Sequence, residues 1–292
     1  MRNLPFMVLI CLCLFQLLLP VNVLGQENEI VHRIETVDGN VFIGTIISEN
    51  TEALVINTTG LGEITIQRSN IKTMEEVDAD RIKTGVYWFE NPHSTRYFFA
   101  PTAMGLRDDQ GYYQNTWILF NNANYGLTDN FSMGAGFIPM FLFGISETPI
   151  WLLPKFSIPM AQENIHLSVG ALTGIVTGTG ADGTFGILYG TVTFGSQDRN
   201  LTTGLGYGYA GSNWSQTPML NISGMIRTGR TIYIITENYL FPGVEDFLGF
   251  GSLGVRWAPE NIAIDFALAR TFSEGEGYIG IPWLGLSIPF KR

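Results

Sequence analysis

The chain has 292 residues, a formal net charge of −10 and only 16 lysines and arginines, a charge balance that disfavours binding to nucleic acid. Charged residues make up 14% of the chain, against about 25% in a typical soluble domain, and 34 residues are glycine. The low charge, the abundant glycine and the 13% of aromatic residues together predict a β protein, part of whose surface is not exposed to water.

The first 25 residues have the pattern of a cleaved signal peptide. Arg2 precedes a short apolar run at 9–19, and small residues lead up to a cleavage position after Gly25. The run is too short for a good membrane anchor, although an uncleaved anchor is the alternative. Both cysteines, Cys11 and Cys13, lie in this segment, so the mature chain is expected to form no disulfide and no thiolate metal site. Removal of Arg2 changes the net charge from −10 to −11.

Residues 27–74 follow as a small β domain. Asp38-Gly39 is a hairpin signal, and β-prone runs at 41–47, 53–57, 63–67 and 71–74 come after it. With the run that precedes the hairpin signal, they predict five short strands.

This region resembles the Sm-like family. The resemblance rests on Asp38-Gly39-Asn40-Val41-Phe42-Ile43-Gly44-Thr45-Ile46 and on Ile66-Gln67-Arg68-Ser69-Asn70-Ile71. It implies a small, bent, five-stranded barrel. Ala53 stands where RNA-binding members have an asparagine, and Ser69 stands where they have a glycine. We therefore expect a periplasmic accessory domain and no binding of nucleic acid.

Residues 75–95 are predicted to be a linker, because they mix charged residues with Trp88 and Pro92. From Arg96 to residue 292 the chain repeats one unit of β-prone sequence followed by a short polar break. The breaks lie at 107–111, 127–129, 144–148, 162–163, 178–182, 197–198, 212–216, 228–229, 242–245, 260–261 and 273–276. Eleven breaks separate about twelve strands, an even number as in bacterial outer-membrane barrels. The fold class predicted for the whole chain is all-β: a transmembrane antiparallel barrel preceded by the Sm-like domain.

Alternation within the strands supports a barrel wall. Ile264, Phe266 and Leu268 fall on one face of their strand, and Asp265 and Ala267 fall on the other. Across the strands the second face is mostly Gly, Ser, Thr and Ala, whereas the outer face of a soluble sandwich usually carries Lys, Glu and Arg. The pattern therefore favours an enclosed lumen and a lipid-facing exterior.

The break at 260–261 also predicts a register. A two-residue turn there places Trp257 opposite Ile264 on the outer face and Arg256 opposite Asp265 on the inner face. A slip by one residue would break the apolar pair and the charged pair together.

Aromatic residues gather near the predicted strand ends, as in an interfacial belt. One rim is predicted to carry Tyr125, Phe131, Phe194, Trp257 and Phe290, and the other Trp151, Phe185, Tyr209, Phe241, Phe247, Phe272 and Tyr278. Phe290, near the end of the chain, resembles the terminal aromatic signal of outer-membrane barrels. An even strand number would place both barrel termini in the periplasm.

The sequence offers little catalytic or metal chemistry. His32, His93 and His166 are far apart and have no metal-ligand spacing, so we expect no metal and no cofactor. His166 and Ser168 suggest a hydrolase, but both are predicted to face the lumen, whereas a membrane-lipid hydrolase needs its nucleophile on the lipid-facing wall. We therefore predict no catalytic residue.

The predicted lumen contains a few charged side chains. Arg256 and Asp265 form a predicted ion pair, and Lys155, His166 and Arg227 are further lumen-facing candidates. They are either a selectivity lining or structural partners that brace a glycine-rich wall. We favour the structural interpretation for Arg256 and Asp265.

Three functions remain open for this sequence. The leading hypothesis is an outer-membrane barrel that acts as a narrow pore for small solutes. The second is a non-conducting anchor or assembly platform for the periplasmic Sm-like domain, which would contact a periplasmic protein or the cell wall. The third is an outer-membrane lipid-modifying enzyme. In each case the expected partner of the barrel wall is the lipid bilayer.

Overall fold

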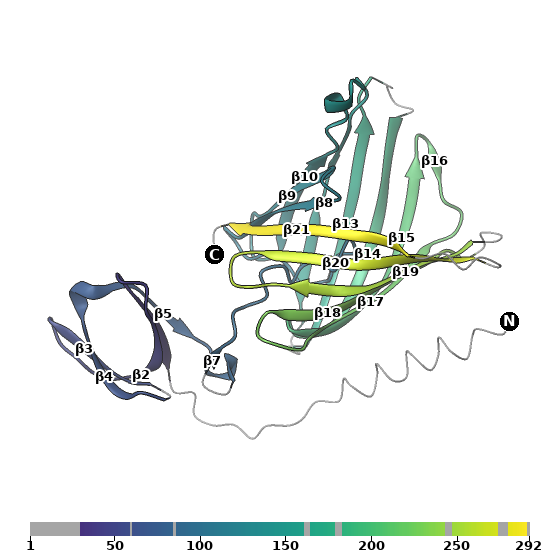
Figure 1. Cartoon of the computed structure of the whole chain (residues 1–292). Helices are drawn as coiled ribbons and strands as arrows, with labels where there is room; N and C mark the ends of the chain where they lie inside the picture. Colours follow the sequence, from purple (N-terminus) through teal and green to yellow (C-terminus); the bar gives the residue numbers. More distant parts are fainter. Residues whose placement is uncertain are drawn as a thin grey trace. The chain divides into compact units, whose positions relative to one another are not determined.

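The computed structural model describes residues 30–58, 60–83, 86–160, 164–178, 183–242, 247–273 and 280–290. The predicted signal peptide and both cysteines lie outside these ranges. The chain divides into two compact units, residues 1–88 and 89–292, and Figure 1 shows the strands of each. We describe each unit by itself.

The N-terminal unit is a five-stranded antiparallel sheet. Its strands are β1 (Val31–Thr36), β2 (Val41–Glu49), β3 (Ala53–Thr58), β4 (Gly62–Gln67) and β5 (Ile71–Val77), in the order β4-β3-β2-β1-β5. Ile34, Leu54, Ile56 and Ile66 form its buried core. The five predicted strands are therefore confirmed, whereas the Sm-like identity of this unit stays a prediction.

The expected linker at 75–95 is partly regular structure. Strand β5 continues to Val77, and a 3-10 turn, η2 (Ala79–Arg81), leads into a short hairpin of β6 (Ile82–Lys83) and β7 (Val86–Tyr87). Residues from Phe89 onward belong to the second unit.

The second unit is a closed antiparallel barrel (Figure 1). Its strands are β8 (Gly111–Thr116), β9 (Phe120–Gly126), β10 (Phe131–Phe137), β11 (Pro149–Leu152), β12 (Lys155–Pro159), β13 (Ile165–Val176), β14 (Thr184–Gly195), β15 (Arg199–Ala210), β17 (Met219–Arg227), β18 (Ile232–Leu240), β19 (Phe247–Trp257), β20 (Ala263–Ser273) and β21 (Ile281–Phe290). Strands β11 and β12 both lie between β10 and β13, so together they occupy one strand position in the barrel wall, with a break between them. Closure comes from the pairing of β8 with β21 and of β9 with β10. Within the described residues the wall thus has twelve strand positions, as predicted. The short strand β16 (Asn213–Trp214) only pairs with the end of β15.

The predicted number twelve contains two errors that cancel. The segment that begins at Arg96 was expected to be the first strand, but its only strand-like pairing is a single bridge between Arg96 and Pro101. Conversely, the run after residue 111 is not one strand but the hairpin β8–β9. Its turn includes Trp117 and Ile118 at φ +50° and +66°. These bulky residues gave no turn signal, because such angles usually call for Gly, Asn or Asp.

The register between β19 and β20 is the predicted one. Trp257 pairs with Ile264 and Arg256 with Asp265. Their side chains follow the predicted sides: Trp257 is 46% exposed, whereas Arg256 is fully buried.

Large apolar side chains cover the outer face of the wall. Val169 is 59% exposed, Leu253 63% and Phe266 50%. Inward positions hold buried polar residues, including Ser168, Thr193 and Thr202. The lumen is less uniformly small and polar than predicted, because β18 turns Tyr233, Ile235 and Tyr239 inward into a buried apolar cluster.

The connections differ in length between the two ends of the barrel. At the end where β8 begins and β21 ends, the strands are joined across 127–130, 160–164, 196–198, 228–231 and 258–262. At the other end the spacings are mostly longer, as at 138–148 and 211–218. A 3-10 helix, η3 (Met140–Phe143), lies in the longest of them.

Among the described residues, no helix has both the length and the apolar character required to span a membrane.

Candidate functional site in the barrel lumen

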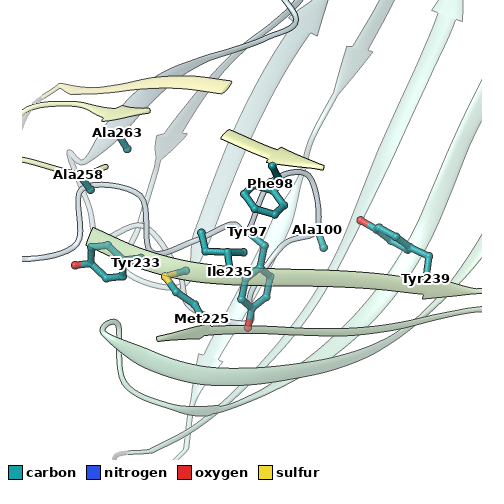
Figure 2. Packing of buried hydrophobic residues seen from close by; sticks show 10 residues of the cluster. Tyr97, Phe98, Ala100, Met225, Tyr233, Ile235, Tyr239, Ala258 and Ala263 are labelled. Carbon is teal, nitrogen blue, oxygen red and sulfur yellow. The ribbon is translucent and has the colours of Figure 1, made fainter. Parts of the chain in front are cut away.

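Residues Phe89–Met104, which we call the luminal segment, lie inside the barrel. Tyr97, Phe98 and Ala100 are buried among inward-facing residues of β17, β18 and β20, as Figure 2 shows for Met225 and Ile235. The segment turns back on itself as a hairpin: the Thr102 amide donates to the Thr95 carbonyl at 2.9 Å, and the Tyr97 amide donates to the Ala100 carbonyl at 2.9 Å.

Arg256 on β19 holds the backbone of this segment. Its guanidinium donates to Asp265 through Nε (2.6 Å) and Nη2 (3.0 Å). It also donates to the carbonyls of His93 (Nη1, 2.6 Å), Arg96 (Nη1, 3.2 Å) and Tyr97 (Nη2, 2.7 Å). An arginine has five N–H donors, and all five of them are used here. The predicted ion pair is therefore one part of a larger clamp.

Glu237 on β18 binds the tip of the same hairpin. Its Oε2 accepts hydrogen bonds from three successive amides, those of Phe98 (2.9 Å), Phe99 (2.9 Å) and Ala100 (3.0 Å). A buried carboxylate is costly unless it is well hydrogen-bonded, and charge-assisted bonds to backbone amides are among the stronger ones. Glu237 thus fixes the turn against β18, while Arg256 fixes its base.

Hydroxyl groups continue the attachment along β14 and β15. The Tyr97 hydroxyl lies 2.6 Å from Asn200 Oδ1 and 2.8 Å from Thr202 Oγ1. Thr202 in turn lies 2.6 Å from Thr193, whose Oγ1 accepts the Ala103 amide at 2.7 Å. These residues are nearly fully buried, so each bond replaces one that water would have made.

Other strands bind the two ends of the segment and its middle. Arg227 on β17 donates to the Phe89 carbonyl at 2.7 Å, and Lys155 on β12 donates to the Met104 carbonyl at 2.6 Å. On β8, Gln114 donates to the Phe98 carbonyl at 3.1 Å. Because β8, β12 and β17 are spread around the barrel, the luminal segment is attached to several sides of the wall and occupies the space between them.

The lumen residues predicted from sequence fall into two groups. Arg256, Asp265, Arg227 and Lys155 all take part in or support the attachment of the luminal segment. Arg227 also pairs with Asp198 at 3.0 Å. His166 faces the lumen opposite Thr193 but has no described bond to the segment. A selectivity role for any of them stays a prediction.

His166 and Ser168 do not form a catalytic pair in the described structure. The Ser168 hydroxyl lies 2.7 Å from Thr191 Oγ1 and is buried, and no hydrogen bond joins it to His166. Among the described residues no cluster of three His, Cys, Asp or Glu could hold a metal ion.

Sequence reasoning missed Glu237 and the luminal segment itself. A glutamate at an inward position in the middle of a strand was the available signal, because such a buried carboxylate needs donors from elsewhere in the chain. No sequence pattern near Arg96 indicated that the backbone amides of Phe98, Phe99 and Ala100 are those donors.

Comparisons with known proteins give distant likenesses only. No family model and no curated protein matches the chain. Among solved structures, the KdgM porin covers 63% of this chain and 99% of its own, at 6% identity and a TM-score of 0.45. The NanC porin covers 62% and 96%, at 10% identity and a TM-score of 0.40. Salmonella typhi OmpF in its complex with daunomycin covers 89% and 96%, at 9% identity and a TM-score of 0.34. These scores are too low to carry an argument, so the barrel described here rests on its own strand pairing.

Proposed function

We propose that this protein is an outer-membrane β-barrel that its own luminal segment holds closed, so that the barrel does not conduct in this arrangement. The observation that carries the proposal is the clamp of Arg256, Asp265 and Glu237 on the segment. A barrel of twelve strands is wider than an eight-stranded one, which side chains alone can fill. A folded segment is what fills the additional space.

The outer face supports a membrane location. Its exposed apolar side chains recur on successive strands, as at Leu188, Leu205 and Leu284, and soluble monomers rarely expose so much contiguous apolar surface. At the end where β8 begins, the predicted aromatic belt faces outward: Phe194, Trp257 and Phe290 are 42%, 46% and 40% exposed. The belt predicted for the other rim is wrong in part, because Trp151 faces the lumen and donates to Asn122.

Orientation follows from the connections. Outer-membrane barrels have short periplasmic turns and longer external loops. The end with the shorter connections is the one where β8 begins, so we place it in the periplasm together with the N-terminal unit. In this proposal the barrel anchors that unit to the membrane, where it can contact a periplasmic protein or the cell wall.

Two experiments test the barrel and its closure. The mature protein should need detergent for extraction and should migrate differently in SDS gels before and after boiling. In planar bilayers the wild type should show no steady conductance, and Glu237→Gln should produce opening events because it weakens three charge-assisted bonds. Glu63→Gln, the same change at an exposed side chain of β4 in the N-terminal unit, is the matched control. Steady conductance of the wild type would contradict the closed barrel.

A gated passage for small solutes is the second candidate. The observation in its favour is that the luminal segment contributes no strand to the wall, which closes through β8–β21 and β9–β10 without it. The segment could therefore leave without breaking the barrel. Liposome swelling in small sugars, with and without Glu237→Gln, separates this candidate from a permanently closed anchor.

A further inference from the structure

The connection between β10 and β11, residues 138–148, displays bulky apolar side chains at its surface. Phe141, Leu142 and Phe143, all in η3, are 59%, 70% and 63% exposed, and Ile145 after them is 39% exposed. In Figure 1 the coiled ribbon of η3 lies beyond the end of β10. Connections at a protein surface are normally polar, and soluble proteins rarely leave such a group of side chains in water. These side chains therefore need an apolar environment that the described part of the chain does not provide.

The sequence on both sides of η3 is also apolar. Glu147 is the only charged residue between Phe131 and Lys155. The connection at 211–218 lies at the same end of the barrel, and it is instead rich in Ser, Asn, Gln and Thr. The apolar character is therefore a property of the connection at 138–148 and not of this end of the barrel.

The exposed apolar surface of η3 continues that of the barrel wall. Phe137, the last residue of β10, is 42% exposed, and its partner Ile150 on β11 is also 42% exposed. Leu152, two positions further along β11, is 49% exposed. Strand β10 has seven residues, whereas a strand that crosses the hydrocarbon core of a membrane needs about 9–11. The connection thus adds apolar surface at the end of a short strand.

The backbone of the connection forms its own hydrogen bonds. Five amides donate to carbonyls of the same connection or of Pro149 at 2.8–3.3 Å, those of Ile138, Met140, Leu142, Gly144 and Ile145. Pro139, between the first two of them, has no amide hydrogen. In hydrocarbon no water replaces a missing backbone bond, so helical turns are compatible with lipid and open loops are not. The connection meets this requirement in η3 and in the residues next to it.

We propose that the connection at 138–148 is a lipid anchor. Phe141, Leu142 and Phe143 enter the acyl chains of the adjacent leaflet, and Glu147 stays in the head-group layer. Short helices that lie at a membrane interface bind by burying bulky apolar side chains in this way. Lipid is the partner, because the apolar surface is continuous with the outer face of the wall. The inference rests on the membrane location proposed above and does not depend on whether the barrel conducts.

The test uses single cysteines in the chain without residues 1–25, and hence without Cys11 and Cys13, labelled with the fluorophore NBD and reconstituted in phosphatidylcholine vesicles. The labelled positions are Leu142→Cys in the connection, Leu188→Cys on the outer face of β14 and Ser212→Cys in the polar connection at the same end. Lipids with a nitroxide on the acyl chain should quench the first two at least about fivefold more strongly than the third, because quenching requires contact with the acyl chains. Iodide in the water should quench in the opposite order.

The possible outcomes separate this inference from the proposed function. Iodide quenching at Leu142→Cys together with lipid quenching at Leu188→Cys would overturn the anchor and leave the membrane barrel intact. Iodide quenching at both positions would contradict the membrane location itself, and the anchor with it. Protection of Leu142→Cys from both quenchers would mean that protein covers the connection, which also overturns the anchor.

Urea unfolding in the same vesicles provides a measurement without a probe. Leu142→Asp should lower the unfolding midpoint, because an apolar side chain leaves the hydrocarbon and a charge takes its place. Ser212→Asp is the matched control and should leave the midpoint unchanged. A side chain that is 70% exposed loses little contact within the chain itself, so equal midpoints for the two variants would show that lipid does not contact Leu142.

Discussion

Arg256 and Asp265 face each other across β19 and β20, with Nε 2.6 Å from Oδ1 and both side chains almost completely buried. The pair is not isolated, because the same guanidinium also binds three carbonyls of the luminal segment. Arg256 is therefore the residue that joins the barrel wall to the segment inside it.

Arg256→Ala should destabilise the barrel by roughly 3–5 kcal/mol, since it leaves a buried carboxylate and three buried carbonyls without their donor. The midpoint of heat-induced gel-shift unfolding should fall accordingly. Asp265→Asn should cost less, because Arg256 keeps its three carbonyl acceptors. Arg107→Ala removes only an exposed ion pair with Glu90 and should shift the midpoint little. Equal midpoints for Arg256→Ala and wild type would show that the clamp does not stabilise the fold.

Release of the luminal segment can be followed with a single cysteine. Ala103 is 1% exposed and its amide binds Thr193, so Ala103→Cys, in a chain without residues 1–25 and hence without Cys11 and Cys13, should resist maleimide labelling. Adding Glu237→Gln should speed labelling about tenfold, because weaker bonds to the tip raise the population of the released segment. Glu147→Gln, at an exposed side chain between η3 and β11, is the control. Fast labelling of Ala103→Cys alone would contradict a buried segment.

The β8–β9 turn offers a stabilising substitution. Ile118 is 83% exposed and adopts φ +66°, a conformation that costs a bulky residue about 1–2 kcal/mol and glycine almost nothing. Glycine loses more conformational entropy on folding, and this cost offsets part of the gain. Ile118→Gly should therefore raise the free energy of unfolding, measured in urea, by about 0.5–1 kcal/mol. Ile234→Gly, on the outer face of β18, should lower it. A loss of stability with Ile118→Gly would mean that its side chain makes contacts outside the barrel.

Gly44 on β2 tests the packing of the N-terminal unit. A Cβ at this position would overlap the Asn57 carbonyl on β3, which is backbone and cannot move aside. Gly44→Val should therefore unfold this unit, seen as rapid proteolysis within residues 30–83, while the gel shift of the barrel stays unchanged. Glu63→Val, at an exposed position of β4, should leave proteolysis slow.

Local pattern was sufficient for much of the fold. The five strands of the N-terminal unit follow from β-prone runs and turn residues, and the pairing of Arg256 with Asp265 follows from a short turn and alternation with period two. The strands and this pairing both depend on residues that are close together in the chain, so they can be predicted from a single sequence. The hairpin at Trp117 and Ile118 was missed for the opposite reason: its positive φ angles are imposed by the strands on either side and by the Trp117 bond to Pro282.

What the sequence alone determined is thus an all-β chain with an alternating apolar wall and one internal ion pair. Only the tertiary structure decided that Phe89–Met104 lies inside the barrel. Most of the bonds that hold it there join residues more than a hundred positions apart, such as Glu237 to Phe98 and Arg256 to Tyr97. No periodicity in a single sequence carries such pairings, because they depend on the closed barrel bringing β18 and β19 to the segment.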